Sequence, residues 1–221
     1  VTSLVPRACK GCGRVEWDRT RLKTCPGCGA ADPFATLERG YLTMFKQILT
    51  GLEATKDEVV FLCEHDVLYT GYHFEFLPPD PGKIYYNQNL WQVRTSDGHC
   101  VYWDSKRVSQ VCAYREVLIE HYRRRVELVE KNGFSMKMGF EPGSHNRKER
   151  VDDLKSEIWV SKIPNIDLKH GLNVTKAKWS PADFRNKNTC QNWQEGDSVP
   201  GWGKTEGRFD EFLRDTLYDK M

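Results

Sequence analysis

The chain has 221 residues, of which 39% are hydrophobic and 12% aromatic, and its 33 basic and 31 acidic side chains give a formal charge of +2. This length supports one hydrophobic core with a small appendage, and the composition excludes a disordered chain. No apolar run approaches the roughly 20 residues that span a bilayer, and no secretory signal pattern opens the sequence, so we expect a cytoplasmic protein without a membrane span.

Four cysteines open the chain as two C-x-x-C-G motifs with twelve residues between them, at Cys9, Cys12, Cys25 and Cys28. Four thiolates complete the tetrahedral shell of a structural zinc ion. Two disulfides are the open alternative, which would require an oxidising compartment. The spacing predicts a small zinc-ribbon-like segment over residues 1–33, followed by a second domain over residues 34–221.

The next elements are a helix and a strand that ends in acidic residues. Apolar residues recur at three- and four-residue intervals over 41–54, which predicts an amphipathic helix. The continuous apolar run over 59–63 predicts a buried, central parallel strand. Glu64 and Asp66 follow it at i and i+2 and should point the same way, whereas His65 should point to the opposite face and pack there.

The position of these two carboxylates indicates a ligand site. Ligands of open α/β sheets bind at the carboxyl ends of the strands. Two convergent carboxylates there can hold a hard divalent cation, which can in turn hold phosphate oxygens. The alternative is a solvated acidic turn.

Further along, residues 83–94 read as strand, and Tyr85, Asn87, Asn89 and Trp91 alternate on it. We expect this strand to be exposed, with at least two of these side chains facing a cleft and the others packing in the core. Ser-Asp-Gly at 96–98 predicts a hairpin turn that leads to a returning strand over 100–103. Residues 109–131 predict the longest helix, with the arginines at 123–125 on its solvated face. Short strands are expected over 157–161 and 165–168, and a last short helix in the tail.

From residue 39 onwards the chain resembles family-2-like glycosyltransferases of the GT-A fold. The block from 39 to 185 covers about two-thirds of the chain, and the resemblance is carried by the segments YLTMFKQILTGL at 41–52, EHD at 64–66, YYN at 85–87, FEPG at 140–143 and HGLNVT at 170–175. It implies an α/β fold with a mixed, mostly parallel sheet flanked by helices.

The resemblance also implies roles for individual residues. Glu64 and Asp66 would match the acidic motif that binds a Mn or Mg ion, with Asp66 as the preferred direct ligand. His170 would close the metal shell, and Glu141 would be the general base of an inverting transfer. Each has a plainer alternative, a histidine at a strand end and a loop glutamate. Tyr85, Asn87, Asn89 and Trp91 would bind donor or acceptor, because aromatic rings beside amide groups suit sugars.

The leading hypothesis is therefore a metal-dependent glycosyltransferase that moves a sugar from a nucleotide-sugar donor to an unknown acceptor. Only about forty residues precede the first helix, where the family places a unit that grips the nucleotide base. The alternative is a non-catalytic, zinc-stabilised binding module on a degenerate GT-A core. Nucleic acid or protein would be its partner, and the locally basic N-terminal segment would suit nucleic acid.

Overall fold

The computed structural model describes residues 7–8, 15–16, 40–143, 150–170, 176–205 and 207. It is a mixed α/β structure with both parallel and antiparallel strand pairs. The chain divides into two compact units: residues 1–60, 78–84 and 113–156 form unit 1, and residues 61–77, 85–112 and 157–221 form unit 2. In the described ranges, no helix is both long enough and apolar enough to cross a membrane.

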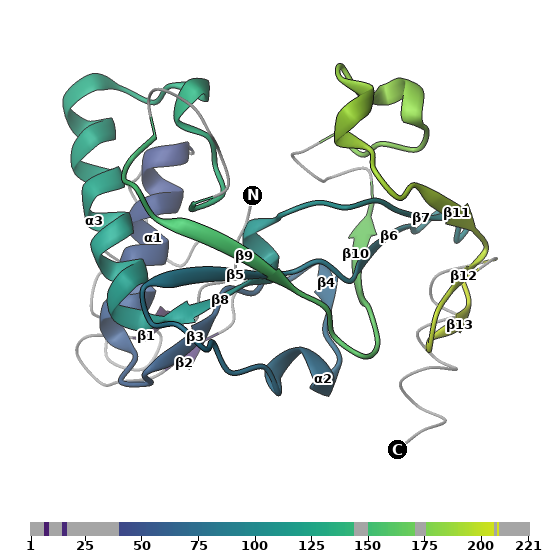
Figure 1. Cartoon of the computed structure of the whole chain (residues 1–221), viewed down its shortest axis with the longest axis horizontal. Coiled ribbons are helices and arrows are strands. Elements are labelled where there is room, and N and C mark those ends of the chain that lie inside the picture. The colour runs from purple at the N-terminus through teal and green to yellow at the C-terminus, as the bar shows by residue number, and fades with distance from the viewer. Residues whose placement is uncertain are drawn as a thin grey trace. The chain divides into compact units, whose positions relative to one another are not determined.

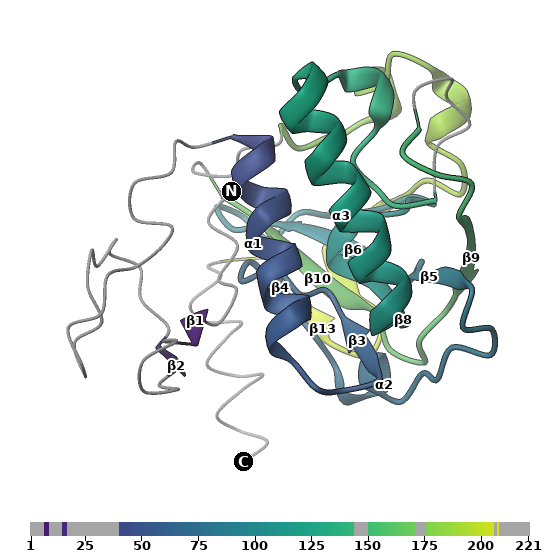
Figure 2. The ribbon, with the colours of Figure 1, turned by 90° about the vertical axis from the view of Figure 1, so that its left-hand side faces the viewer.

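Two helices of unit 1, α1 (Tyr41–Ala54) and α3 (Arg115–Asn132), run side by side, as Figures 1 and 2 show. The rings of Phe45 in α1 and Tyr122 in α3 have their centroids 6.3 Å apart. α1 has the bounds that its apolar spacing predicts. The apolar side chains that the two helices bury are Phe45, Leu52, Leu118, Ile119, Tyr122, Val126 and Val129.

The long helix begins later than the sequence predicts. Val108–Gln110 forms a single 3-10 turn, η1, and Val111–Tyr114 forms strand β8, so α3 starts only at Arg115. The first three residues of β8 are fully buried. Consecutive apolar residues suit a strand that is covered on both faces, and this local run overrides the helical spacing that continues into α3.

Four strands form one sheet in the order β3 (Val59–Phe61), β8, β5 (Lys83–Asn87) and β9 (Lys155–Trp159). In unit 2 the Leu62 N–H donates to the Val111 carbonyl at 3.0 Å, and in unit 1 the Arg115 N–H donates to the Glu58 carbonyl at 2.8 Å. These bonds make β3 and β8 antiparallel. The prediction of a central parallel strand is therefore wrong: β3 ends the order of the described strands and is half-buried.

The segment predicted to continue as strand from residue 83 to 94 is divided in two. β5 ends at Asn87, and β6 (Leu90–Arg94) starts three residues later in another sheet. The Asn87 side-chain oxygen accepts the backbone N–H of Asn89 at 3.0 Å, a local bond that competes with a straight strand.

Unit 2 contains a five-stranded sheet in the order β11 (Gln194–Gly196), β7 (Cys100–Tyr102), β6, β10 (Asn165–Lys169) and β4 (Val67–Leu68). The β6–β10 pair is parallel, whereas β6–β7, β7–β11 and β10–β4 are antiparallel. The expectation of a mostly parallel arrangement is thus wrong for this sheet. Its core contains Trp91, Val93, Cys100, Ile166 and Val199.

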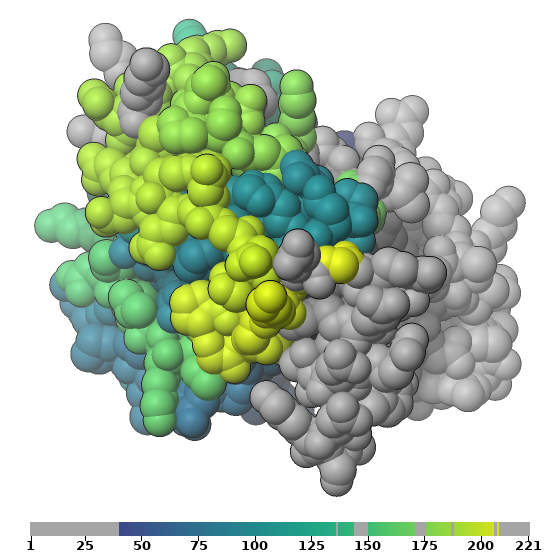
Figure 3. Space-filling model, turned by 90° about the vertical axis from the view of Figure 1, so that its right-hand side faces the viewer, coloured from purple at the N-terminus to yellow at the C-terminus, as the bar shows by residue number. Residues whose placement is uncertain are grey.

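Short elements complete the described chain. β6 and β7 form the predicted hairpin, and residues 176–205, green to yellow in Figure 3, cover one face beside it. The short elements, which are spread along the chain, are α2 (Gly71–Phe74), η2 (Met136–Met138), η3 (Pro181–Asp183), η4 (Lys187–Thr189), β12 (Ser198–Val199) and β13 (Gly203–Lys204). The predicted helix in the tail lies outside the described residues.

Candidate functional site

The acidic residues after β3 lie in a turn that is held by backbone hydrogen bonds, both within the turn and to β10. The Val67 N–H donates to the Glu64 carbonyl at 3.4 Å, which closes the turn. The Leu168 N–H of β10 donates to the Asp66 carbonyl at 2.8 Å. β4 and β10 continue this antiparallel pairing, with Val67 opposite Asp167. The turn and β10 are therefore direct neighbours within unit 2.

A tyrosine holds the start of this turn. The backbone N–H of Glu64 donates to the Tyr69 hydroxyl oxygen at 2.9 Å, and the same hydroxyl donates to the Ser109 carbonyl at 2.9 Å. The ring of Tyr69 also lies 5.0 Å from the ring of the buried His73. Because the hydroxyl bonds two backbone segments at once, it fixes the position of Glu64.

The environment of Glu64 perturbs its ionisation strongly. Burial is the main cause that raises its pKa to about 7, and the charges of Asp66 and Asp167 raise it further. Lys169 and Arg107 act in the opposite direction. Like charges that share a partly buried position disfavour ionisation, so ionised Glu64 is costly without a counter-charge. A cation held at this turn would relieve that cost.

Asp167 is a functional candidate that the sequence analysis missed. Its side chain is 6% exposed, and its two oxygens contact Arg107 Nη1 at 2.5 Å and Lys169 Nζ at 2.8 Å. It lies inside the apolar-polar alternation of β10, which by itself predicts only a strand. The pairing of β10 with β4, which brings Asp167 to the acidic turn, is a long-range contact that no local pattern encodes.

The structure does not gather the predicted metal ligands into one three-residue site. In the described part of the chain, no three His, Cys, Asp or Glu side chains are arranged to hold a metal ion. His170 follows β10 directly and is exposed. His65 is exposed as well, so the prediction that it packs against the protein is wrong. Of the predicted ligands, Glu64 and Asp66 lie near each other.

The residues predicted to recognise a sugar are mostly buried. Tyr85, Asn87 and Trp91 are at most 6% exposed, so the expectation of an exposed strand is wrong, and Asn89 is half-buried. The Asn87 amide donates to the Ser161 hydroxyl at 2.9 Å and accepts the Ser161 N–H at 3.2 Å. Alternation predicts two faces but not that both are covered, and here consecutive residues of β5 and β6 are buried.

Glu141 lies in a constrained turn of unit 1 and is half-buried. Before it, the Gly139 carbonyl accepts Arg125 Nη1–H at 2.9 Å. After it, Gly143 has φ +62°, and a Cβ there would lie 3.0 Å from the Leu154 carbonyl oxygen. The turn therefore requires glycine at position 143, which fixes the backbone that carries Glu141.

Arg125 supports this turn from α3. It is 1% exposed, which corrects the prediction that it belongs to the solvated face, whereas Arg123 and Arg124 are exposed as expected. Its Nε–H donates to Nε2 of the buried His121 at 3.1 Å, and His121 Nδ1 lies 2.7 Å from Asp152. Burial is the main cause that lowers the pKa of His121, so the neutral ring donates to Asp152 and accepts from Arg125.

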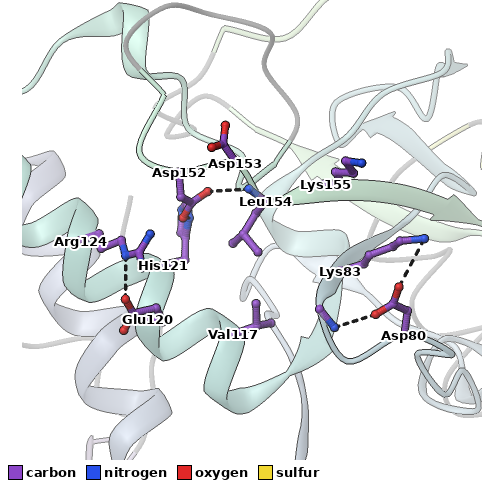
Figure 4. A pocket seen from close by; sticks show the side chains of 11 residues that line it. Asp80, Lys83, Val117, Glu120, His121, Arg124, Asp152, Asp153, Leu154 and Lys155 are labelled. Carbon is purple, nitrogen blue, oxygen red and sulfur yellow. Dashed lines mark hydrogen bonds and ion pairs between the residues drawn. The ribbon is translucent and has the colours of Figure 1, made fainter.

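A cavity of about 400 Å³ lies in unit 1 beside this histidine, between α3 and the segment 152–155 (Figure 4). Its charged side chains largely neutralise one another: Arg124 pairs with Glu120 at 2.7 Å, and Lys83 lies 3.5 Å from Asp80. The His121–Asp152 contact lies on its wall.

The four cysteines of the predicted zinc segment lie outside the described residues. Two short described strands flank Cys9 and Cys12 in the sequence. They are β1 (Arg7–Ala8) and β2 (Val15–Glu16), and they pair antiparallel. Zinc at this segment therefore stays a prediction.

Comparisons with known proteins do not place the chain in a family. No protein-family model matches the sequence, and neither a curated protein nor a solved structure matches it.

Proposed function

We propose that this chain is a metal-dependent glycosyltransferase of the GT-A type, with a nucleotide-sugar donor and an inverting outcome. The observation that carries the proposal is the fastened turn after β3, where Glu64 and Asp66 lie half-buried beside a third carboxylate, Asp167. Burial, together with the charges of Asp66 and Asp167, raises the pKa of Glu64 to about 7, and a divalent cation at this turn would gain binding energy by compensating the ionised carboxylates.

The two carboxylates of the turn suit a Mg or Mn ion in chemistry and in number. Mg²⁺ is usually bound through one or two protein carboxylates, with substrate phosphates and water filling the other positions. A third protein ligand such as His170 is then not required. When bound, the ion would neutralise negative charge on the diphosphate leaving group. Glu64 and Asp66 would orient that ion at the end of β3.

Glu141 is the proposed general base. It would take the proton of an acceptor hydroxyl while the acceptor oxygen attacks the anomeric carbon and the bond from that carbon to the diphosphate breaks. A base needs a fixed position relative to the attacking oxygen, and the Gly139–Gly143 turn held by Arg125 supplies a rigid backbone for it.

Hydrolysis or transfer from a panel of nucleotide-sugar donors, measured with and without Mn²⁺, tests this function. The wild-type protein should consume at least one donor in a Mn²⁺-dependent manner. Asp66→Ala and Glu141→Gln should each lose about 100-fold or more in turnover, and Glu141→Gln should still bind donor. Asp57→Ala, at an exposed carboxylate, serves as the control. Full activity in Asp66→Ala would remove the metal assignment.

A second function, a non-catalytic binding module, is favoured by the burial of Tyr85, Asn87 and Trp91, which leaves less polar and aromatic surface for a sugar. In this case the basic N-terminal segment would bind nucleic acid through phosphate contacts. Fluorescence anisotropy with single- and double-stranded oligonucleotides at two salt concentrations separates the functions. Salt-sensitive binding without donor turnover would favour the module.

A further inference from the structure

A buried histidine of α3 links three segments of unit 1. His121 Nδ1 lies 2.7 Å from Oδ2 of Asp152, whose other oxygen accepts the Leu154 N–H just before β9. The second ring nitrogen, Nε2, accepts Nε–H of Arg125 at 3.1 Å. Arg125 Nη1–H donates to the Gly139 carbonyl at 2.9 Å. One chain of hydrogen bonds therefore joins the segment before β9, the helix α3 and the turn at 139–143.

Each ring nitrogen of His121 has a fixed role in this chain. A guanidinium N–H can only donate, so Nε2 must be an acceptor without a hydrogen, and Nδ1 carries the ring hydrogen towards Asp152. A protonated imidazole donates from both nitrogens. Its Nε2–H would meet the Arg125 Nε–H donor to donor. The Arg125 bond and the protonated ring therefore exclude each other.

The charges around the ring act in the same direction. Arg125 and Asp152 are one buried cation and one largely buried anion, which balance while the ring is neutral. A proton on His121 adds a second positive charge beside Arg125. Burial is the main cause that lowers the pKa of His121; Arg125 and Arg124 lower it further, and Asp152 acts in the opposite direction.

The other charged groups around this histidine come from several elements. Among the described residues, those that line the cavity beside it are Asp80, Lys83, Glu120, Arg124, Asp153 and Lys155. The pairs among or next to them are Arg124–Glu120, Lys83–Asp80 and Arg150–Asp153. α1 places the ring of Phe45 against Arg125, at 4.9 Å, and the turn carries Glu141. The anion that contacts the His121 ring directly is Asp152.

We propose that His121 is an acid-sensitive switch: when its ring binds a proton, the Arg125 bond breaks and the turn at 139–143 is released from α3. The ring keeps its bond to Asp152 in the released state. Because His121 binds its proton less readily in the bonded state than an ordinary histidine with a pKa of 6.5, the released state gains as the pH falls below that value. The switch does not depend on the proposed function, and it holds even if Glu141 is not a base.

Nuclear magnetic resonance of the full chain, titrated from about pH 8 to pH 5, tests the switch. The Arg125 Nε–H should be protected from exchange with water at the start. It should lose this protection with the same midpoint at which the ring carbons of His121 report protonation. The Nε–H of the exposed Arg124 is the matched control. Its exchange should only become slower as the pH falls, because exchange of unprotected N–H groups is catalysed by base.

A pair of neighbouring carboxylates tests the cause. Asp152→Asn should move the midpoint of the Arg125 signal to lower pH by about one unit, because it removes the anion that favours the protonated ring. Asp153→Asn, at an exposed carboxylate, should leave the midpoint where the wild type has it.

Several outcomes would overturn the switch. Arg125 Nε–H might stay protected while the His121 ring titrates, or lose its protection while the ring stays neutral. Protection of Arg125 and a neutral ring throughout the titration would also count against it. Loss of the folded signal of Val93, in the core of unit 2, at the same midpoint would show global unfolding instead of local release.

Discussion

Tyr69 and Glu64 are joined by a hydrogen bond in which the backbone N–H of Glu64 donates to the tyrosine hydroxyl at 2.9 Å. The same hydroxyl donates a hydrogen bond to the Ser109 carbonyl, also at 2.9 Å. The acidic turn is thereby fixed from outside its own segment. Preorganised ligands lower the free energy that a metal site spends on ordering itself, so this bond connects the fold to the proposed chemistry.

Replacing Tyr69 by Phe should lower the free energy of unfolding by about 1–2 kcal/mol, because it leaves the Glu64 N–H and the Ser109 carbonyl without this partner. Urea denaturation measures the change. Tyr72→Phe makes the same chemical change three residues away and should cost less than about 0.5 kcal/mol. Equal stability of the two variants would mean that the Tyr69 hydroxyl does not fasten the turn.

Glu64 should make the stability of the protein depend on pH. Its pKa rises from an ordinary 4.5 to about 7 in the folded state, so the folded protein holds this proton more tightly than the unfolded chain. The stabilisation is present in full below pH 4.5 and is lost as the pH rises to about 7. Glu64→Gln should therefore match the wild type near pH 4 and exceed its free energy of unfolding at pH 8 by about 1–3 kcal/mol.

Denaturation curves at the two pH values check this expectation. Glu75→Gln, at an exposed glutamate of the same unit, is the control and should show no such pH-dependent gain. A Glu64→Gln effect of the same size at both pH values would show that the carboxylate is not perturbed.

The neighbouring arginines of α3 allow a matched comparison. Arg125→Met should lower the free energy of unfolding by about 2–4 kcal/mol, since it leaves the Gly139 carbonyl and His121 Nε2 without their buried donor. Arg124→Met removes an exposed i,i+4 pair with Glu120 and should cost less than about 0.5 kcal/mol. Thermal or chemical denaturation measures both. Similar costs for the two variants would contradict the role given to Arg125.

The N-terminal cysteines should hold metal. Elemental analysis of the purified chain should find about one zinc ion per molecule, lost in Cys9→Ser or Cys28→Ser and retained in Cys63→Ser, because four thiolates form a closed shell. Two disulfides and no zinc would instead indicate an oxidising compartment.

Local patterns in the sequence predict the elements that depend on neighbouring residues. The helix over 41–54 keeps its predicted bounds because its apolar spacing matches the face that contacts α3. The β6–β7 hairpin is correct because Asp97 and Gly98 suit a tight turn, with Gly98 at φ +77°. The strand at 165–169 agrees with its prediction to within one residue.

Properties that depend on long-range pairing were not predictable in the same way. The run at 59–63 is apolar enough for a central strand, but strand order decides that β3 is half-buried. Helical spacing puts Arg125 three residues after Tyr122 and four before Val129, on the buried face of α3, but only the fold shows that it contacts Gly139 and Phe45. Asp167 has no local signal, because its importance comes from the strand that pairs beside it.

Uptake of Mn²⁺ by the zinc-loaded protein, followed by the resonance signal of the free ion, tests most directly whether the turn at Glu64 and Asp66 is a cation site. The wild-type chain and Asp57→Ala should bind Mn²⁺ alike, and Asp66→Ala should lose at least about tenfold in affinity because a direct carboxylate ligand is gone. Equal Mn²⁺ binding by Asp66→Ala and the wild type, or no binding by the wild type, would contradict the metal-dependent transferase.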